Sequence, residues 1–265
     1  MLSYQHAYHA GNIADLQKHA ALAWALEYLT RKDKPLSYVE THAGRGLYDL
    51  EGAEARKTGE AAAGIGSLEG VLPEDHPLRG VLAEVRAAHG PAAYPGSPLI
   101  AETLLRDSDR MHLAELHPAE HAALSQVMVR ADIHRRDGFE LAQSILPPTP
   151  RRGLLLCDPS YEVKRDYELV PKQFQQFAAK WNVGVLMLWY PILTDAPHKP
   201  MLRALERAFP DALRTEIAFP PVREGHRMVG SGMFVVNPPF GLEGAMAALS
   251  RGLRAALIRT GPKGR

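Results

Sequence analysis

Apolar residues along the chain form long helical patterns that alternate with short strand-like runs. Residues 13–30 keep roughly helical spacing of apolar positions, among them Leu16, Ala20 and Leu26, and Pro35 follows the end of this segment. The next segment, LSYVETHAGRG (36–46), has the pattern of a short strand that enters a glycine-containing turn. The pattern therefore predicts an N-terminal helix followed by the first strand of a sheet.

Further apolar runs of strand length follow, and each ends in polar, Gly or Pro residues. Segments of helical length separate them, for example 118–129 and 138–146. Strands that alternate with helices are typical of a parallel α/β sheet. The predicted strands are residues 111–116, 131–134, 153–157 and 183–189.

The last third of the chain breaks this alternation. Residues 213–219 and 228–236 are strand-like, and the segment between them is too short to hold a crossover helix. We therefore expect an antiparallel hairpin, followed by a helix over 241–260. A parallel sheet that is closed by an antiparallel hairpin is the order found in Rossmann-like methyltransferases, although this is an analogy at the level of the fold alone.

One segment, residues 49–94, does not fit the α/β pattern. It is rich in Ala, Gly and Glu and has no strand-like run. It also separates the first two predicted strands by more than one crossover helix requires. We predict a helical insertion here, within a single domain that spans residues 1–265.

Composition limits the class of protein. The chain has 265 residues, 46% of them hydrophobic, and a formal net charge of +1. Its one cysteine, Cys157, excludes an internal disulfide framework and a cysteine-rich zinc site. No run approaches the ~18 apolar residues of a membrane span, and the first ten residues do not resemble a secretion signal. We expect a soluble, cytoplasmic protein that acts as a monomer.

The charge is unevenly distributed. Residues 49–121 carry 13 acidic and 6 basic side chains, whereas residues 222–265 carry 7 basic and 2 acidic ones. A neutral total can therefore coexist with a basic face. Near the proposed site and the C-terminus we expect such a face to hold Arg135, Arg136, Arg151, Arg152, Lys164, Arg165, Arg223 and Arg227.

The strongest chemical signal is the sequence Asp158-Pro159-Ser160-Tyr161, which directly follows the apolar run GLLLC. A carboxylate at the end of a buried parallel strand lies where open α/β sheets bind their ligands. Asp158 and the Pro159 carbonyl can accept the two N–H groups of an exocyclic amine, and Tyr161 can stack on a base. An ordinary turn is the alternative interpretation.

A similar tetrapeptide, Asn237-Pro238-Pro239-Phe240, follows the last predicted strand. The amine-binding motif belongs at the end of the fourth strand, so we interpret this second copy as a turn. A four-residue motif is therefore weak evidence for a function when it is taken alone.

Polar residues also follow the first three predicted strands. The turn from Thr41 to Gly46 contains small residues that would allow a ligand to approach the backbone closely. Glu115 follows the second strand and can accept the hydroxyls of a ribose, and Asp137-Gly138 follows the third. Each has an ordinary alternative, such as a surface acid for Glu115 or a helix N-cap for Asp137.

The N-terminal twenty residues are rich in histidine and tyrosine. Most histidines are surface or satisfied core residues, and that remains the default for His6 and His9. The segment has no HExxH motif and no acidic cluster, so we predict no metal site.

Taken together, these segments resemble the RlmJ family of bacterial 23S ribosomal RNA adenine-N6 methyltransferases. The resemblance spans nearly the whole chain and keeps the family's order of motifs. The segments that carry it are LSYQHAYHAGNIADLQKH, THAGRGLYDL, YPGSPLIAETLLR, ELHP, DGF, RRGLLLCDPSYE and SGMFVVNPPF.

The resemblance implies a Rossmann-like class I methyltransferase with a mixed seven-stranded sheet, an antiparallel last strand and a small helical insertion. It implies S-adenosylmethionine as cofactor, S-adenosylhomocysteine as product and one adenine of 23S ribosomal RNA as target. The catalytic residues would be Asp158, Pro159 and Tyr161. Tyr4 and His6 would contact the RNA. The cofactor would be bound by Lys18, His19, His42, Ser97, Glu115, Asp137, Gly138 and Asp158.

One position departs from the family, because Ser160 stands where the family usually has proline. The two acceptors are retained, so we expect activity to survive with a looser loop. The remaining alternatives are a methyltransferase that acts on DNA adenine, on another RNA or on a protein amide, and a non-catalytic RNA-binding relative. The incomplete glycine pattern disfavours a dinucleotide oxidoreductase.

Overall fold

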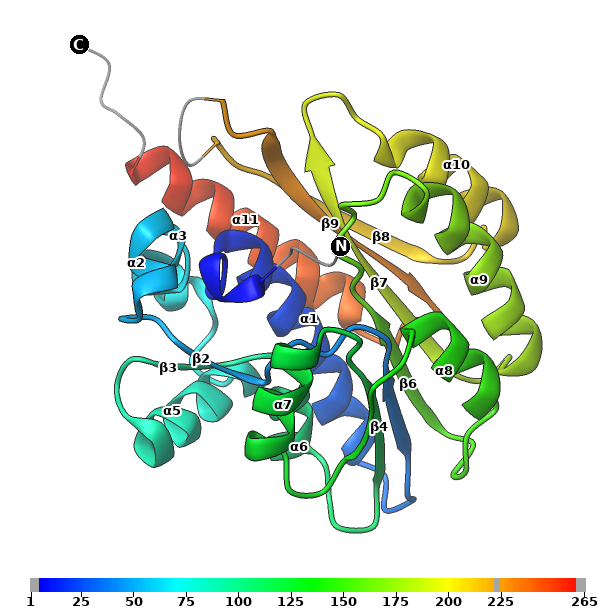
Figure 1. The fold of residues 1–265 in the computed structure, drawn as a ribbon. Coiled ribbons are helices and arrows are strands. Elements are labelled where there is room, and N and C mark those ends of the chain that lie inside the picture. Colours follow the sequence, from blue (N-terminus) through cyan, green and yellow to red (C-terminus); the bar gives the residue numbers. More distant parts are fainter. Residues whose placement is uncertain (1–4, 222–224, 261–265) are drawn as a thin grey trace.

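The computed structural model describes residues 5–221 and 225–260 of the chain. A seven-stranded sheet with helices on both faces forms its centre, and its strand order is β5-β4-β1-β6-β7-β9-β8 (Figure 1). The strands of this sheet are β1 (Ser37–Glu40), β4 (Arg110–Ala114), β5 (Asp132–His134), β6 (Gly153–Cys157), β7 (Val185–Leu193), β8 (Leu213–Ala218) and β9 (Met228–Val236).

The strand directions confirm the predicted mixed sheet. β5, β4, β1, β6 and β7 are mutually parallel. β9 is antiparallel to both β7 and β8, so β8 and β9 form the expected hairpin. This strand order, with its reversed strand β9, is the one expected from the resemblance to Rossmann-like class I methyltransferases.

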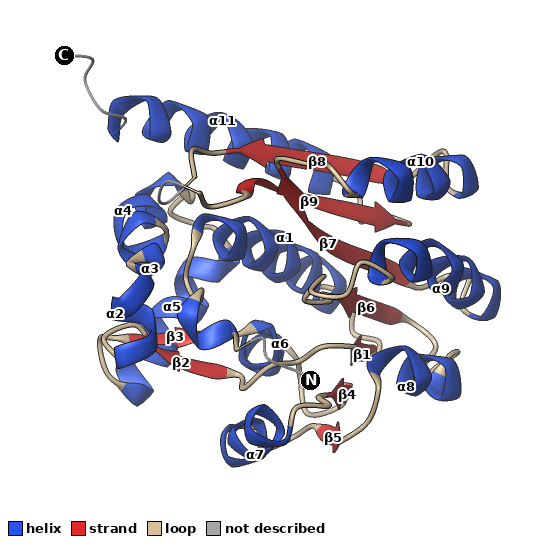
Figure 2. Cartoon of the chain, turned by 45° about the horizontal axis from the view of Figure 1, so that its top comes forward, coloured by secondary structure: helices blue, strands red, loops and turns tan. Residues whose placement is uncertain are grey.

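Helices cover both faces of the sheet (Figures 1 and 2). α1, α6 and α11 lie on one face, and α8, α9 and α10 lie on the other. The helices are η1 (His6–Tyr8), α1 (Ile13–Thr30), α2 (Ala53–Thr58), α3 (Glu60–Ala63), α4 (Ile65–Leu68), η2 (Glu69–Val71), α5 (Pro77–His89), α6 (Ser97–Leu104), α7 (Pro118–Val127), α8 (Gly138–Ile145), α9 (Asp166–Lys180), α10 (His198–Ala208) and α11 (Leu242–Thr260).

Strand β6 illustrates how the core forms. All five of its residues are buried, as expected for a central parallel strand. Because side chains alternate between the faces, Leu154 and Leu156 join the core beside α1, whereas Leu155 and Cys157 join the core beneath α8 and α9. The uninterrupted apolar run of the sequence is therefore explained by burial on both faces.

Residues 49–94 contain helices α2 to α5, but the expectation that they lack strands is wrong at both ends. β2 (Leu47–Asp49) and β3 (Ala93–Pro95) pair as a small antiparallel sheet. Each has only three residues, too few for alternation to be visible in the sequence. Apolar side chains of the insertion, including Leu68 and Leu82, belong to the same core cluster as α1.

The carboxyl ends of the parallel strands lie along one edge of the sheet. β1 ends at Glu40, β4 at Ala114 and β6 at Cys157, and these strands are direct neighbours. The segments that follow them therefore meet at this edge. In the described part of the chain, no helix combines the length and the apolar character needed to cross a membrane.

Candidate active site

A cavity of about 460 Å³ lies along the carboxyl edge of the sheet. This volume suits a small-molecule ligand. Its lining brings together all the predicted site residues that the structure describes: His6, Lys18, His19, His42, Ser97, Glu115, Asp137, Gly138, Asp158, Pro159 and Tyr161. Tyr4 lies outside the described residues.

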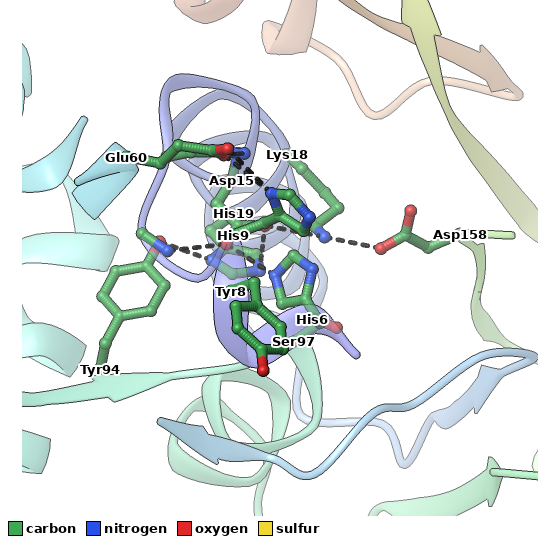
Figure 3. A network of polar contacts seen from close by, with 12 residues as sticks. His6, Tyr8, His9, Asp15, Lys18, His19, Glu60, Tyr94, Ser97 and Asp158 are labelled. Atoms are coloured by element: carbon green, nitrogen blue, oxygen red, sulfur yellow. Dashed lines mark hydrogen bonds and ion pairs between the residues drawn. The ribbon is translucent and has the colours of Figure 1, made fainter. Parts of the chain in front are cut away.

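The first helix and strand β6 meet in this cavity through an ion pair. The Lys18 Nζ atom donates to the Asp158 Oδ2 atom over 2.6 Å, as Figure 3 shows. Lys18 is buried, whereas the Asp158 side chain is 15% exposed and borders the cavity. The same ammonium lies 5.7 Å from the centre of the Trp189 ring. Asp158 thus reaches the cavity with one oxygen already bound to a cation.

A second buried carboxylate, Asp15, contacts the same lysine. Its Oδ1 atom lies 3.0 Å from Lys18 Nζ. Its Oδ2 atom accepts hydrogen bonds from the His6 ring over 2.8 Å and from the Gly11 backbone N–H over 2.9 Å. Burial favours the neutral acid, but His6 and Lys18 outweigh this and hold the pKa of Asp15 well below its usual range. Likewise, burial opposes the Lys18 charge, but Asp15 and Asp158 raise the pKa of Lys18.

The two histidines that were predicted to bind the cofactor, His19 and His42, are held in their neutral form. Burial lowers the pKa of His19 to about 3, and its Nδ1 atom lies 2.8 Å from the Tyr94 hydroxyl. Burial also lowers the pKa of His42, whose Nδ1 atom lies 2.8 Å from the Thr41 hydroxyl. Neutral imidazoles can donate or accept hydrogen bonds without adding positive charge to the cavity.

Ser97 is bound to a carboxyl group that the sequence analysis missed. Its hydroxyl forms a hydrogen bond with Glu40, the last residue of β1, and the Tyr38 hydroxyl donates to the other oxygen over 2.8 Å. Burial raises the pKa of Glu40 to about 8, so the group is protonated at neutral pH. The pair fixes the first residue of α6 against the end of β1.

Glu115 anchors the turn that follows β1. One carboxylate oxygen accepts the Gly44 N–H over 2.8 Å, and the other accepts the His117 N–H over 2.7 Å. Burial raises the pKa of Glu115. Each oxygen keeps a free lone pair, so the side chain can still accept a hydrogen bond from a hydroxyl group of a ligand.

Asp137 and Gly138 begin helix α8 at the same edge. The Asp137 side chain accepts a hydrogen bond from the Glu140 N–H over 3.0 Å. Asp137 is therefore the N-cap of α8, as its ordinary alternative role predicts. A Cβ atom on Gly138 would lie 1.8 Å from the Thr41 carbonyl oxygen. Only glycine allows this close approach of α8 to the turn after β1.

Tyr161 is held firmly beside Asp158. Its φ angle is 54°, in the left-handed region that is uncommon for residues other than glycine. Its hydroxyl donates to the Trp189 carbonyl oxygen over 3.0 Å, and its ring centre lies 4.6 Å from that of Tyr167. Ser160, by contrast, is exposed. The loop is therefore fixed through the aromatic residue.

The insertion holds the N-terminal turn that carries His6. Glu60 accepts hydrogen bonds from His9 over 2.9 Å and from Asn12 over 3.1 Å, as part of the network in Figure 3. The Gly11 carbonyl oxygen accepts the Ile65 N–H over 2.8 Å. The insertion thus contacts the segment that brings His6 to the cavity.

The second tetrapeptide, which begins at Asn237, lies at the opposite edge of the sheet. The Asn237 side chain donates to the Asn182 and Gly184 carbonyl oxygens, which precede β7. This placement agrees with its interpretation as a turn. In the described residues, no three His, Cys, Asp or Glu side chains are arranged around a common metal position.

The expected basic face is wrong for two of its members. Arg151 and Arg152 precede β6, whereas Asp158 follows it, so they lie at the edge away from the cavity. The Arg152 guanidinium instead donates to the carbonyl oxygens of Leu29 and Lys34. The two arginines are close to Asp158 in sequence but not in space, because strand β6 lies between them and a five-residue strand is ~17 Å long.

Asp15, Glu40 and Trp189 were missed by sequence reasoning. Asp15 had a usable signal, because positions 15, 18 and 19 are spaced to share one face of a helix. Glu40 was also visible, as an acid between a strand and a glycine turn. Trp189 had no such signal, because it resembles any other apolar residue of β7.

The chain is similar to known proteins in sequence and in structure. A family profile described as "Ribosomal RNA large subunit methyltransferase D, RlmJ" matches residues 33–264. The chain is 38% identical to ribosomal RNA large subunit methyltransferase J of Escherichia coli K12 over 98% of its own length and 96% of that protein. It is 39% identical to the protein of the same name from Haemophilus influenzae, with the same coverage.

A solved structure is also similar. A crystal structure of a protein from Legionella pneumophila superposes with a TM-score of 0.85 at 32% identity, over 94% of each chain. The profile, the two relatives and this structure each cover most of the chain. The chain therefore belongs to the RlmJ family of ribosomal RNA large subunit methyltransferases.

Proposed function

We propose that the protein transfers a methyl group from S-adenosylmethionine to the N6 atom of one adenine in 23S ribosomal RNA. The observation that carries the proposal is Asp158, which follows the central strand β6 and borders the cavity beside Pro159. Membership of the RlmJ family supports the RNA substrate. Such a substrate implies that the enzyme works in the cytoplasm.

The residues of the cavity fit the proposed cofactor. Gly138 allows α8 to approach the turn after β1 closely, and both segments line the cavity. Glu115 would accept the ribose hydroxyls, and Asp137-Gly138 would lie at the adenine edge. Near the methionine part we place Lys18, His19, His42 and Ser97.

The chain's own groups would prepare the target amine. The adenine amino nitrogen is a poor nucleophile, because its lone pair is delocalised into the ring. Asp158 and the Pro159 carbonyl would accept its two hydrogens, which makes the lone pair available for attack. When bound, S-adenosylmethionine supplies a methyl group on a cationic sulfur. The methylated nitrogen is cationic and acidic, and Asp158 would take its proton. Positioning is the main catalytic contribution.

The target base must leave its stack to reach this cavity. Tyr161 and Trp189 provide an aromatic wall beside Asp158, and a base that stacks on such a wall gains ~1–3 kcal/mol. Because the Tyr161 hydroxyl is bound to the Trp189 backbone, this wall is ordered before the RNA arrives.

The proposal is tested by transfer of tritium from labelled S-adenosylmethionine to stripped 23S RNA, assembled large subunits and duplex DNA. We expect transfer to 23S RNA, and loss of transfer in Asp158→Ala even at saturating concentrations of the cofactor. Retained turnover in Asp158→Ala would refute the assignment of Asp158. Methylation of DNA alone, or binding without turnover, would favour a different substrate or a non-catalytic relative.

The cellular substrate needs a separate measurement. Mass spectrometry of digested 23S RNA from a strain that lacks the gene should show one adenine without its N6-methyl group. An unchanged RNA would exclude this target.

A further inference from the structure

Asp15 is a buried carboxylate for which the reaction outlined above has no role. It lies in the first turn of α1, is 2% exposed and borders the cavity. A buried carboxylate is costly unless charged or hydrogen-bonding groups surround it. His6 and Gly11 bind the Oδ2 atom of Asp15. Its Oδ1 atom faces Lys18, with the His19 Nε2 atom further away at 3.8 Å.

The Lys18 ammonium is shared between two carboxylates. It lies 3.0 Å from Asp15 Oδ1 and 2.6 Å from Asp158 Oδ2, and all three groups face the cavity (Figure 3). A lysine paired with Asp158 alone would form a neutral pair. With Asp15 present, the three groups together carry a net charge of −1.

Neighbouring groups do not cancel this charge. Burial keeps His19 and His42 neutral and leaves Glu40 protonated near pH 7, as described above. A neutral imidazole can donate its Nε2 hydrogen, so the hydrogen bond from His6 to Asp15 does not require a charged ring. Glu115 and Asp137, also on the cavity wall, would add only negative charge.

We propose that Asp15 is a charge-balancing residue of this site, which offsets the Lys18 ammonium so that Asp158 remains an effective acceptor and the cavity favours a cationic ligand. The inference rests on the proposed function, because the cationic ligand would be S-adenosylmethionine. The product, S-adenosylhomocysteine, has lost the sulfonium charge. A cavity with net negative charge therefore discriminates in favour of the substrate form and assists release of the product.

The test is the ratio of the affinities for the two ligands, measured by calorimetry at pH 8. In Asp15→Asn the three-residue cluster becomes neutral, and the remaining side-chain oxygen can still accept the Gly11 N–H. We expect the affinity for S-adenosylmethionine to fall about tenfold, the size of one charge acting over ~10 Å of protein, and that for S-adenosylhomocysteine to change less than about twofold. Equal loss of both affinities would mean that Asp15 is merely structural.

A second pair of variants keeps the test decisive if Asp15→Asn folds poorly. Lys18→Met gives the cluster a charge of −2, and the double variant with Asp15→Asn restores −1. We expect the preference for the cationic ligand to be strongest in Lys18→Met, to be close to the wild-type value in the double variant, and to be weakest in Asp15→Asn. A preference in Lys18→Met that is no stronger than in the wild-type protein and the double variant would overturn the proposal.

Asp109→Asn is the matched control. Asp109 is also a buried carboxylate with a basic partner, Arg106, but it precedes β4 and lies at the opposite edge of the sheet. Its replacement should leave the affinity ratio unchanged. If the wild-type protein binds neither ligand, the proposed function fails; if it binds both and Asp15→Asn keeps the same ratio, only the charge-balance proposal fails.

Discussion

Lys18 and Asp158 are separated by 140 positions in the sequence, and the lysine Nζ and aspartate Oδ2 atoms lie 2.6 Å apart. This contact joins a helix that precedes the sheet to the loop that follows its central strand. The loop itself is held by Tyr161, so the ion pair fixes the carboxylate rather than the chain around it. Asp158 is thus directed into the cavity by a residue from outside the α/β repeat.

Replacing Lys18 with Met should therefore impair the reaction more than ligand binding. Asp158 would lose the partner that fixes its rotamer, and we expect kcat to fall about 100-fold, the size typical of misplaced catalytic groups. Stability should also fall, by about 3 kcal/mol, because Asp15 stays buried without its cation. Single-turnover methylation and urea unfolding measure the two effects. A variant with wild-type kcat would mean that Asp158 needs no orienting partner.

Glu40 gives the protein a specific dependence of stability on pH. Its pKa is about 8 in the folded protein, against an ordinary value of 4.5, so the folded state holds a proton that the unfolded chain releases between these values. The stabilisation from this group is complete below pH 4.5 and is lost as the pH rises through 8. Glu40→Gln, which cannot ionise, should become relatively more stable over this range, by at most about 1.4 kcal/mol per pH unit.

Urea midpoints at pH 5.5 and 8.5 test this expectation. We expect the difference between Glu40→Gln and the wild type to favour the variant at the higher pH. Parallel pH profiles would show that Glu40 is ionised in the folded protein.

Gly138→Ala should damage the cofactor cavity. The new methyl group would lie 1.8 Å from the Thr41 carbonyl oxygen, so α8 must move away from the turn. We expect a loss of about 1–3 kcal/mol in the free energy of unfolding and weaker cofactor binding. Gly80→Ala is the control, because nothing lies within 4 Å and the position is inside α5. It should stabilise the protein by about 0.5–1 kcal/mol.

Lys164 and Arg165 are exposed in the loop after Asp158, and we expect them to contact RNA phosphates. Alanine at either position should raise KM for RNA several-fold and leave cofactor affinity unchanged. Each lost phosphate contact should reduce the salt slope by about 0.7–0.9. Arg151→Ala, at the opposite edge, should change neither. An equal effect of Arg151→Ala would show that the RNA covers both edges.

The sequence predicted the regular elements well where a local pattern determines them. The predicted helix over 13–30 and strand over 153–157 have the same bounds as α1 and β6. It failed where structure depends on distant partners. The three-residue strands β2 and β3 exist only because they pair across the insertion, and Arg151 was misplaced because strand direction was ignored. For the site, the resemblance named the catalytic and cofactor-binding residues. It did not name Asp15, because the contact of Asp15 with Lys18 depends on how deeply both side chains are buried.

The pairing of β2 with β3 brings the two ends of the insertion together. Leu47 is paired with Pro95, and the Gly96 N–H donates to the Gly46 carbonyl oxygen over 2.7 Å. This pairing holds the turn after β1 against the start of α6, where Ser97 borders the cavity. The N-terminal turn, however, depends on Glu60 and Ile65. The insertion therefore supports the cavity in two ways: its paired ends join the turn after β1 to the start of α6, and its helices hold the N-terminal turn and pack in the core beside α1.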